Sequence, residues 1–177
     1  MEDLTVDLLE IQDKEQLLDE LMHCYGQQIL QLTYSYVHSK EVAEDLTQDI
    51  FVKCYKSFHT FNGGSMIRTW LWRIAINHCK DYLRSLYNKK VVVSENDLTY
   101  IGGRQESVEQ TIMRKDEDHH LSSTVMQLPI KYREVIYLFY FEELQIKEIS
   151  LVLEVKESTV KTRLKRAKEI LKKVLGE

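Results

Sequence analysis

The sequence predicts an all-α protein of two small helical domains, a helical bundle and a helix-turn-helix, joined by a flexible linker. Apolar residues recur at helical spacing along most of the 177 residues, and only one proline and six glycines interrupt them. An all-β fold would need many more turns. The pattern predicts helices over 15–37, 40–58, 66–87, 107–127, 130–142, 145–153 and 158–175.

The predicted breaks between helices fall where glycine and proline occur. Gly63-Gly64 separates the second and third helices, and Pro129 begins a new one, where its missing N–H does no harm. Residues 88–106 show little helical patterning, and we interpret Val91-Val92-Val93 as linker. We therefore expect an N-terminal extension (1–14), a first domain (15–88), a linker (89–120) and a second domain (121–177). Each domain is small enough for its own core to be marginal.

The formal net charge of −4 averages segments of opposite sign. Residues 1–60 carry 4 basic and 12 acidic side chains, whereas residues 61–90 carry 6 and 1, and residues 156–177 carry 8 and 3. Binding of a polyanion depends on the local density of Lys and Arg, because each neutralised phosphate releases a counterion. The two basic segments are therefore candidate nucleic-acid surfaces, although solvated helix faces would look similar.

Several other classes of protein are disfavoured by the sequence. No apolar run approaches the roughly 20 residues of a membrane span, and the acidic N-terminus lacks the pattern of a signal peptide. Cys24, Cys54 and Cys79 are far apart and form no CxxC pair, which indicates reduced cytoplasmic thiols, the last two in the core. The adjacent pair His119-His120 leaves a metal site open, but neighbouring helical residues diverge by about 100°. We predict no metal and no cofactor.

The C-terminal residues carry the pattern of a helix-turn-helix. Val160, Leu164 and Ala167 begin an apolar stripe that Leu171 and Val174 continue, and lysines and arginines surround it. A short helix over 145–153 precedes it after a tight connection at 154–157. The N-terminal residues of such a second helix point at base edges in the major groove. A lysine-rich surface helix is the alternative, which the tight turn and polar helix start disfavour.

The helix predicted over 66–87 combines cations with aromatic residues. One face carries Trp70, Arg73, Asn77, Lys80 and Arg84, a composition typical of single-stranded DNA binding, in which bases stack on rings and cations hold phosphates. We expect Trp72 to lie in the core, leave Trp70 open between core and DNA, and expect Asp81 to form a local salt bridge.

The helix predicted over 40–58 has an acidic face opposite its apolar one. The predicted buried face comprises Ala43, Leu46, Thr47, Ile50 and Cys54. The opposite face carries Glu41, Glu44, Asp45, Gln48 and Asp49, with Val52 and Tyr55 beside it. Such a face suits a protein partner with basic side chains, although composition alone favours a solvated surface.

Two groups of motifs resemble one protein family. Segments 128–136 (LPIKYREVI), 148–150 (EIS) and 158–168 (STVKTRLKRAK) are similar to region 4 of the extracytoplasmic-function (ECF) sigma factors, small members of the bacterial sigma-70 family. Segments 43–51 (AEDLTQDIF) and 68–77 (RTWLWRIAIN) are similar to region 2. The sequence departs from the family pattern at Glu154, usually glycine, at Ser150, usually alanine, and at Ile67, often phenylalanine. Glu154 in a left-handed turn would cost about 1 kcal/mol relative to glycine.

The resemblance implies three sets of binding residues. Those implied to dock on a coiled coil of the largest subunit of core RNA polymerase are Asp45, Leu46, Gln48, Asp49, Phe51, Val52 and Tyr55. Those implied to recognise and open the −10 promoter element are Phe61, Asn62, Gly63, Gly64, Ser65, Arg68, Thr69, Trp70, Arg73, Asn77, Lys80 and Arg84. Those implied to read the −35 element are Arg133, Lys156, Ser158, Thr159, Lys161, Thr162, Arg163, Lys165 and Arg166.

The resemblance further implies a cytoplasmic, non-enzymatic transcription factor. Its partners would be core RNA polymerase, including the flap region, promoter DNA and an anti-sigma factor, often membrane-bound, that releases it in a stress response. No small-molecule substrate and no membrane insertion are implied. The alternatives are a helix-turn-helix regulator without a sigma role and a metal- or redox-sensing protein that uses the cysteines.

Overall fold

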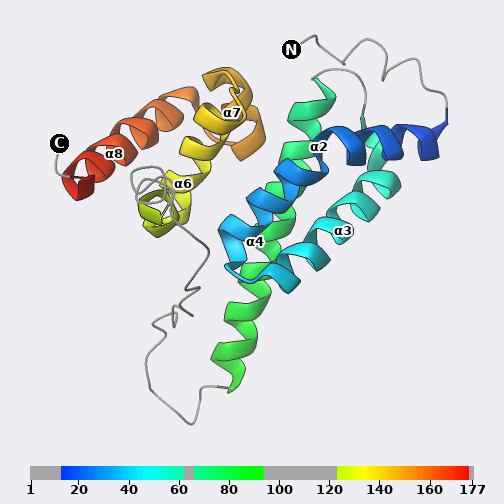
Figure 1. The fold of residues 1–177 in the computed structure, drawn as a ribbon, viewed down its shortest axis with the longest axis horizontal. Coiled ribbons are helices and arrows are strands. Elements are labelled where there is room, and N and C mark those ends of the chain that lie inside the picture. The colour runs from blue at the N-terminus through cyan, green and yellow to red at the C-terminus, as the bar shows by residue number, and fades with distance from the viewer. Residues whose placement is uncertain (1–12, 62–65, 94–122, 176–177) are drawn as a thin grey trace, which may run out of the picture.

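The computed structural model describes residues 13–61, 66–93 and 123–175, and within these ranges every regular element is helical. Figure 1 shows a group formed by α2, α3 and α4 beside a second group formed by α6, α7 and α8. The elements are α2 (Lys14–Val37), α3 (Lys40–Ser57), η1 (Phe58–Thr60), α4 (Ile67–Val93), α6 (Ile130–Ile136), η2 (Tyr137–Phe141), α7 (Ile146–Leu153) and α8 (Glu157–Leu175). The all-α prediction is confirmed. The proposed extension up to residue 12, residues 94–120 of the proposed linker, and His119-His120 lie outside the described residues.

Polar caps and one left-handed residue set the geometry of the first two helices. Asp13 caps α2 by accepting a hydrogen bond from the backbone N–H of Glu15 at 3.0 Å, and Ser39 is the N-cap of α3. His38 ends α2 at φ 55°, and its N–H bonds the Tyr34 carbonyl at 2.9 Å. Only these two residues, His38 and Ser39, separate α2 from α3, so the helices pack antiparallel.

Helix α4 is longer than predicted. It continues through Val91-Val92-Val93, which we interpreted as linker, and so passes the proposed domain boundary at residue 88. No glycine or proline occurs between Gly64 and Gly102. Adding a residue to an existing helix costs little compared with starting a new one, so this apolar run is added to the end of α4.

The C-terminal group contains the predicted helix-turn-helix. Pro129 precedes α6, as predicted, and α6 continues into the single π-helical turn η2. The turn after α7 places Glu154 at φ 55° and ψ 42°, the left-handed conformation expected where the family pattern has glycine. The Val155 N–H bonds the Ser150 carbonyl at 3.1 Å, which closes this turn.

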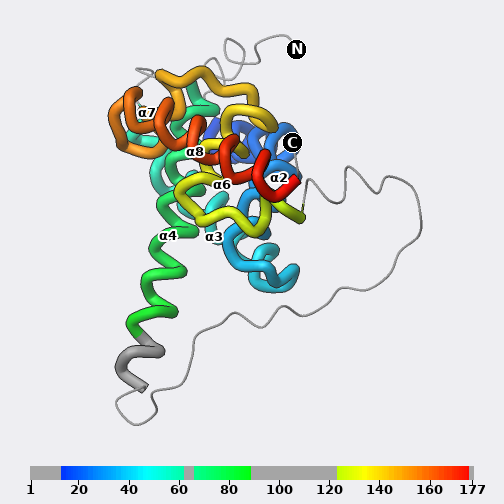
Figure 2. The backbone as a smooth tube through the Cα atoms, turned by 90° about the vertical axis from the view of Figure 1, so that its left-hand side faces the viewer, coloured from blue at the N-terminus to red at the C-terminus, as the bar shows by residue number. Residues whose placement is uncertain are grey.

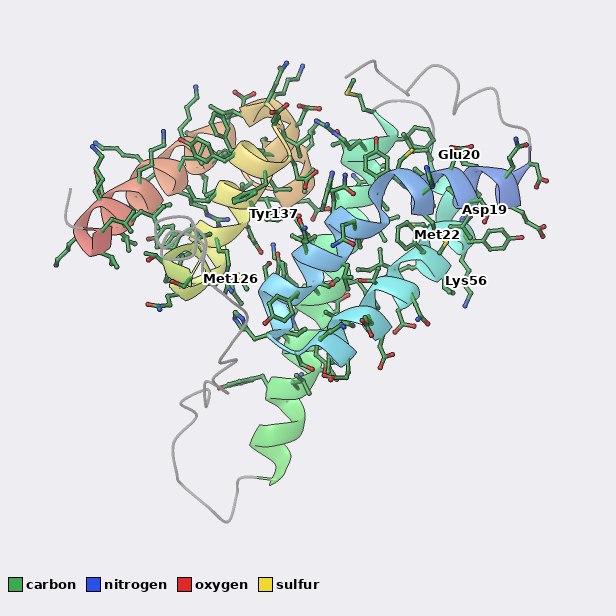
Figure 3. The ribbon with its side chains drawn as sticks, viewed as in Figure 1. Asp19, Glu20, Met22, Lys56, Met126 and Tyr137 are labelled. Carbon is green, nitrogen blue, oxygen red and sulfur yellow. The ribbon has the colours of Figure 1, made fainter. Side chains whose placement is uncertain are left out.

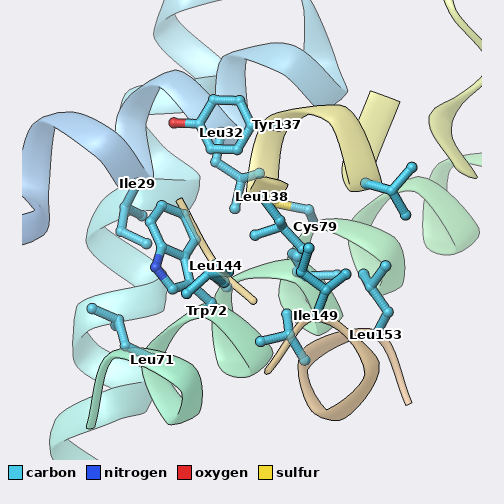
Figure 4. Close-up of a cluster of buried hydrophobic side chains, with 14 of the residues drawn as sticks. Ile29, Leu32, Leu71, Trp72, Cys79, Tyr137, Leu138, Leu144, Ile149 and Leu153 are labelled. Atoms are coloured by element: carbon cyan, nitrogen blue, oxygen red, sulfur yellow. The ribbon is translucent and has the colours of Figure 1, made fainter. Parts of the chain in front are cut away.

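The two groups share one hydrophobic core. Figure 4 shows Trp72 and Cys79 of α4 in one cluster with Leu138 and Ile149 of the C-terminal group. The Trp72 and Tyr137 rings meet edge to face with centroids 6.0 Å apart. Figure 2 shows the compact body formed by both groups, with the end of α4 projecting from it. Each domain therefore completes the marginal core of the other.

We predict that Leu138→Ala lowers the free energy of unfolding by about 2–5 kcal/mol, since it removes fully buried atoms and leaves a cavity. Leu151→Ala removes the same atoms at a side chain that is 50% exposed and should cost less than about 1 kcal/mol. Urea unfolding followed by circular dichroism measures both. Equal losses would mean that Leu138 is not a core residue.

Candidate nucleic-acid and protein interfaces

A shallow cationic pocket lies at the start of α8. Its lining comprises Lys131, Tyr132, Ser158, Thr159, Thr162, Arg163 and Arg166. The Thr162 hydroxyl donates to the Ser158 carbonyl at 2.8 Å, in the first turns of the helix. The first backbone N–H groups of a helix favour an anion. The pocket thus joins residues predicted from the helix-turn-helix pattern to a second group from α6.

Lys131 and Tyr132 are pocket residues that the sequence reasoning missed. The Lys131 ammonium lies 5.1 Å from the centre of the Tyr132 ring. A hydrogen bond with Arg166 is the main cause that lowers the pKa of Tyr132. Both residues stand in the motif LPIKYREVI, but only the packing of α6 on α8 brings them to the helix start.

Among the other cations predicted to contact the −35 element, three lysines at or near the start of α8 are exposed and one arginine of α6 is not. The exposed ones are Lys156, Lys161 and Lys165. Arg133 is buried instead, and its guanidinium donates to the Ser35 carbonyl near the C-terminus of α2. The last carbonyls of a helix lack partners within the helix and attract a cation. The prediction that Arg133 contacts DNA is therefore wrong for this conformation.

Trp70, the aromatic residue predicted on the face of α4 that binds single-stranded DNA, lies in the core instead. Trp70 is only 2% exposed, stacks on Phe58 with ring centroids 5.6 Å apart, and bonds the Thr60 hydroxyl through Nε1 at 3.4 Å. Thr69 is also buried. Neither is available for base stacking or for contact with DNA here, because both side chains are buried, Trp70 beneath Phe58 and Thr60 of η1. Trp72, expected in the core, is fully buried.

The other residues predicted to contact the −10 element differ in whether their polar groups are exposed or paired with other side chains. Arg73 is exposed, Asn77 and Phe61 are half-buried, and Arg84 pairs with Asp81 at 3.0 Å, as predicted for Asp81. The Lys80 ammonium lies 3.1 Å from a carboxylate oxygen of Glu134, in the other domain. Asn62, Gly63, Gly64 and Ser65 lie outside the described residues.

The outer face of α3 combines carboxylates with exposed apolar groups. Asp45, Gln48 and Asp49 are exposed, as are half of Val52 and 39% of Tyr55. Leu46 and Phe51 are buried, so their predicted role in docking is corrected to core packing. Their positions on the helix face α2 and α4 rather than solvent.

Helix α2 adds a residue to this face that the sequence reasoning missed. Met22 is 46% exposed. Figure 3 shows Asp19, Glu20 and Met22 of α2 at the same end of the helical pair as Lys56 of α3. This end of the helical pair therefore combines an exposed methionine with charges of both signs, while the acidic part of the face lies on α3 at Asp45 and Asp49.

Comparison with known proteins identifies the family. Residues 21–88 match the family model for Sigma-70 region 2, and residues 121–171 match that for Sigma-70, region 4. The RNA polymerase sigma-H factor of Pseudomonas aeruginosa is 33% identical over 164 residues, which cover 89% of this chain and 85% of that protein. The ECF RNA polymerase sigma factor SigM of Bacillus subtilis is 32% identical over 156 residues, covering 88% and 93%.

The chain belongs to the ECF sigma factors. The fold agrees with this. The sigma factor RpoE of Bartonella quintana, in a co-crystal with the anti-sigma factor NepR, superposes with a TM-score of 0.72 at 19% identity, covering 89% of this chain and 96% of that one. CnrH, in complex with the cytosolic domain of CnrY, superposes with a TM-score of 0.66 at 21% identity, covering 98% and 95%.

Two of the three thiols of this sigma factor are poorly suited to redox sensing. Cys54 and Cys79 are buried, as predicted, and burial raises the pKa of each thiol to about 12. A thiol must lose its proton to become a nucleophile or a metal ligand.

Among the residues that the structure places, no group of three His, Cys, Asp or Glu could hold a metal. None of the described helices is long and apolar enough to cross a membrane.

One histidine of this sigma factor lies at the contact between its domains. His38 Nε2 lies 3.1 Å from an Arg133 nitrogen, so the neutral ring accepts this hydrogen bond. Burial and then the Arg133 charge lower the pKa of His38. The folded chain thus binds fewer protons than the unfolded chain, and stability falls as the pH drops below the ordinary value of 6.5.

We predict that the thermal midpoint of the wild-type chain falls between pH values of about 7.5 and 5.5. The midpoint of His38→Gln should fall less, because the amide oxygen accepts the same bond without titrating. Part of the fall should remain, since burial also lowers the pKa of His78. Calorimetric scans across this range measure both curves. Identical pH dependences would contradict a protonation-sensitive bond at His38.

Proposed function

We propose that this chain is an alternative sigma factor, which binds the core enzyme of bacterial RNA polymerase and directs initiation at a distinct set of promoters. The observation that supports this most is the match of regions 2 and 4, in order, to a chain whose α8 presents a cationic helix start. The family consists of transcription initiation factors, and the chain acts by binding rather than by catalysis.

Helix α8 would read the −35 element as duplex. Ser158, Thr159 and Thr162 stand at the helix start, where side chains reach base edges in the major groove. Arg163 and Arg166 flank them and would hold phosphates, with Lys131 and Tyr132 added from α6. The exposed lysines at 156, 161 and 165 extend the same surface.

Helix α4 and the segment before it would recognise and open the −10 element. Arg68, Arg73, Asn77, Lys80 and Arg84 supply polar or cationic groups for one strand. Extruding a base costs a few kcal/mol, offset by a pocket and by contacts to the strand. We assign that pocket to the segment 61–65. The Trp70 ring contacts Phe61, the first residue of this segment, with centroids 5.7 Å apart.

The outer face of α3 would dock on the polymerase. Asp45, Gln48 and Asp49 offer acceptors and charge, and Val52 and Tyr55 offer apolar surface, so a basic coiled coil is a suitable partner. Met22 of α2 extends the same surface. We further propose contact with the polymerase flap region through the C-terminal domain.

Regulation by an anti-sigma factor forms part of the proposal. RpoE of Bartonella quintana was crystallised with an anti-sigma factor, and CnrH with the cytosolic domain of CnrY. By analogy, an anti-sigma factor would hold this chain in the cytoplasm, in some cases near the membrane, until a stress signal releases it.

Run-off transcription tests the proposal directly. Purified chain and core polymerase, supplied with a library of promoter fragments from the host genome, should yield specific transcripts that neither component gives alone. A helix-turn-helix regulator would bind DNA but would give no transcript with core polymerase alone. That result would replace the sigma function with the alternative.

We predict that Asp49→Arg lowers affinity for core polymerase by about tenfold or more, because like charges placed together cost several kcal/mol. The Asp49 side chain is 67% exposed, so the fold should tolerate the change. Glu15→Arg makes the same charge change at an exposed position in the first turn of α2 and serves as control. Fluorescence anisotropy with labelled chain measures affinity. Equal affinities for Asp49→Arg and wild type would remove α3 from the docking surface.

We predict that Arg166→Ala weakens binding to a short duplex of random sequence. The slope of log affinity against log salt concentration should fall by about 1 in magnitude, because one phosphate contact is lost. Lys172→Ala removes a charge from the last turn of α8, away from the pocket, and should leave the slope nearly unchanged. An unchanged slope for Arg166→Ala would place this side chain off the DNA.

A further inference from the structure

One carboxylate on the outer face of α3 lies against a histidine of α4. Asp49 Oδ2 is 3.8 Å from His78 Nε2, where α3 packs on α4. The Asp49 side chain is 67% exposed, whereas the His78 side chain is only 22% exposed. The pair therefore connects a charged group that a partner protein can reach to a titratable group that is mostly buried.

The ring of His78 lacks a hydrogen bond that this carboxylate could supply. A separation of 3.8 Å is too long for a hydrogen bond. The Nε2 atom is shielded from solvent, and none of the described residues forms a hydrogen bond with it. A buried polar atom without a partner is unfavourable. Because Asp49 is largely exposed, a small rotation of its carboxylate would give Nε2 a partner.

Charged groups of both helices act on the His78 ring. Burial and then the charge of Lys53, one helical turn after Asp49, lower the pKa of His78, while Asp49 and Asp81 act in the opposite direction. The ring is therefore neutral at a pH of about 7.5 and leaves the Asp49 charge uncompensated. Protonation turns the contact into an ion pair, because an imidazolium donates a charge-assisted hydrogen bond to a carboxylate.

We propose that His78 controls how much negative charge Asp49 offers to the polymerase, so that core docking releases a proton from His78 and weakens on acidification. This inference rests on the proposed function, because it takes Asp49 as a contact of a basic coiled coil. His78 acts through Asp49 and is thus a positioning residue. A carboxylate has two oxygens, so the neutral ring leaves Asp49 able to accept bonds from a partner.

Docking and protonation oppose each other for two reasons. A basic partner group placed at Asp49 repels a second positive charge on the ring, and the partner would also cover the exposed part of His78, which disfavours the charged form. The pKa of His78 must therefore fall further on docking. By linkage, affinity for core polymerase decreases as the pH drops, and the slope of log affinity against pH gives the number of protons released.

The first experiment uses the free chain and follows the His78 ring by NMR between pH values of about 8 and 5. Asp49→Asn removes the carboxylate but keeps the side-chain shape, so the pKa of His78 should shift down. Glu41→Gln removes a charge from the exposed first turn of α3 and should leave the pKa of His78 unchanged. An unchanged pKa of His78 in Asp49→Asn would overturn the proposal.

The second experiment measures the affinity of labelled chain for core polymerase by anisotropy at pH values of about 7.5 and 5.5. His78→Gln keeps a hydrogen-bond donor beside Asp49 but does not titrate. A change of one pKa unit on docking corresponds to tenfold in affinity, so wild type should lose roughly three- to tenfold more affinity over this range than His78→Gln. At the higher pH the two chains should agree within about twofold, because the ring is neutral.

Two controls separate this effect from that of other titrating groups. His59→Gln removes an exposed imidazole of η1 and should keep the wild-type pH dependence. In an Asp49→Asn background, His78→Gln should change nothing further, because the two side chains act as one pair. If His78→Gln fails to fold by circular dichroism, Asp49→Asn decides the outcome, since it should lose the same part of the pH dependence.

Equal losses of affinity in wild type and His78→Gln would overturn the proposal, and so would an Asp49→Asn variant with the wild-type pH dependence. Either result would leave the sigma function intact, because run-off transcription at one pH does not depend on the titration of His78. A chain that binds no core polymerase at either pH would instead lose the sigma function, and this inference with it.

Discussion

The contact between the domains is built around a buried carboxylate, Glu134, which belongs to one domain and has its hydrogen-bond and ion-pair partners in the other. Glu134 is buried, and its partners, the Tyr36 hydroxyl and the Lys80 ammonium, come from α2 and α4. An ionised group out of water is tolerated only with such partners. Around this bond, Trp72 and Tyr137 join the apolar surfaces of both domains into one core. Separating the domains therefore exposes apolar area and leaves Glu134 without Tyr36 and Lys80, so a partner that opens the chain must compensate for both.

The contact between the domains decides which basic side chains are exposed and which are paired or buried. The net charge of −4 combines an acidic first third with two basic segments. The basic start of α8 is exposed in the closed chain, whereas Lys80 of α4 is paired with Glu134 and Arg133 is buried. The two proposed DNA surfaces are thus unequally available. The proposed duplex-reading surface is exposed, whereas one cation of the proposed strand-reading surface, Lys80, is paired with Glu134.

Local patterns predicted most of the fold and part of the sites. Helical spacing placed the helices, and the short connection at 154–157 predicted a turn. The resemblance, which has glycine at this turn, implied a left-handed Glu154, as observed. The resemblance assigned Leu46, Phe51 and Trp70 to partners, but all three are buried. The helical pattern had placed Leu46 on the buried face, as observed, and had left Trp70 open between core and DNA. For Phe51 and Trp70, tertiary packing decides which side of the helix meets another helix, and periodicity does not reveal it. Arg133, Tyr132 and Met22 depend on contacts between separate segments, for which the sequence has no local signal.

The central claim is that the two domains of the free chain pack on one shared core as a single body. Energy transfer between dyes on α4 and α8 measures this most directly. Cysteines introduced at the exposed positions Ser85 and Lys172, in a Cys24→Ser background, would carry the dyes, since Cys54 and Cys79 are buried. The account predicts a single narrow population at high transfer for the free chain. A broad population at low transfer, as expected of two domains that move independently, would contradict it.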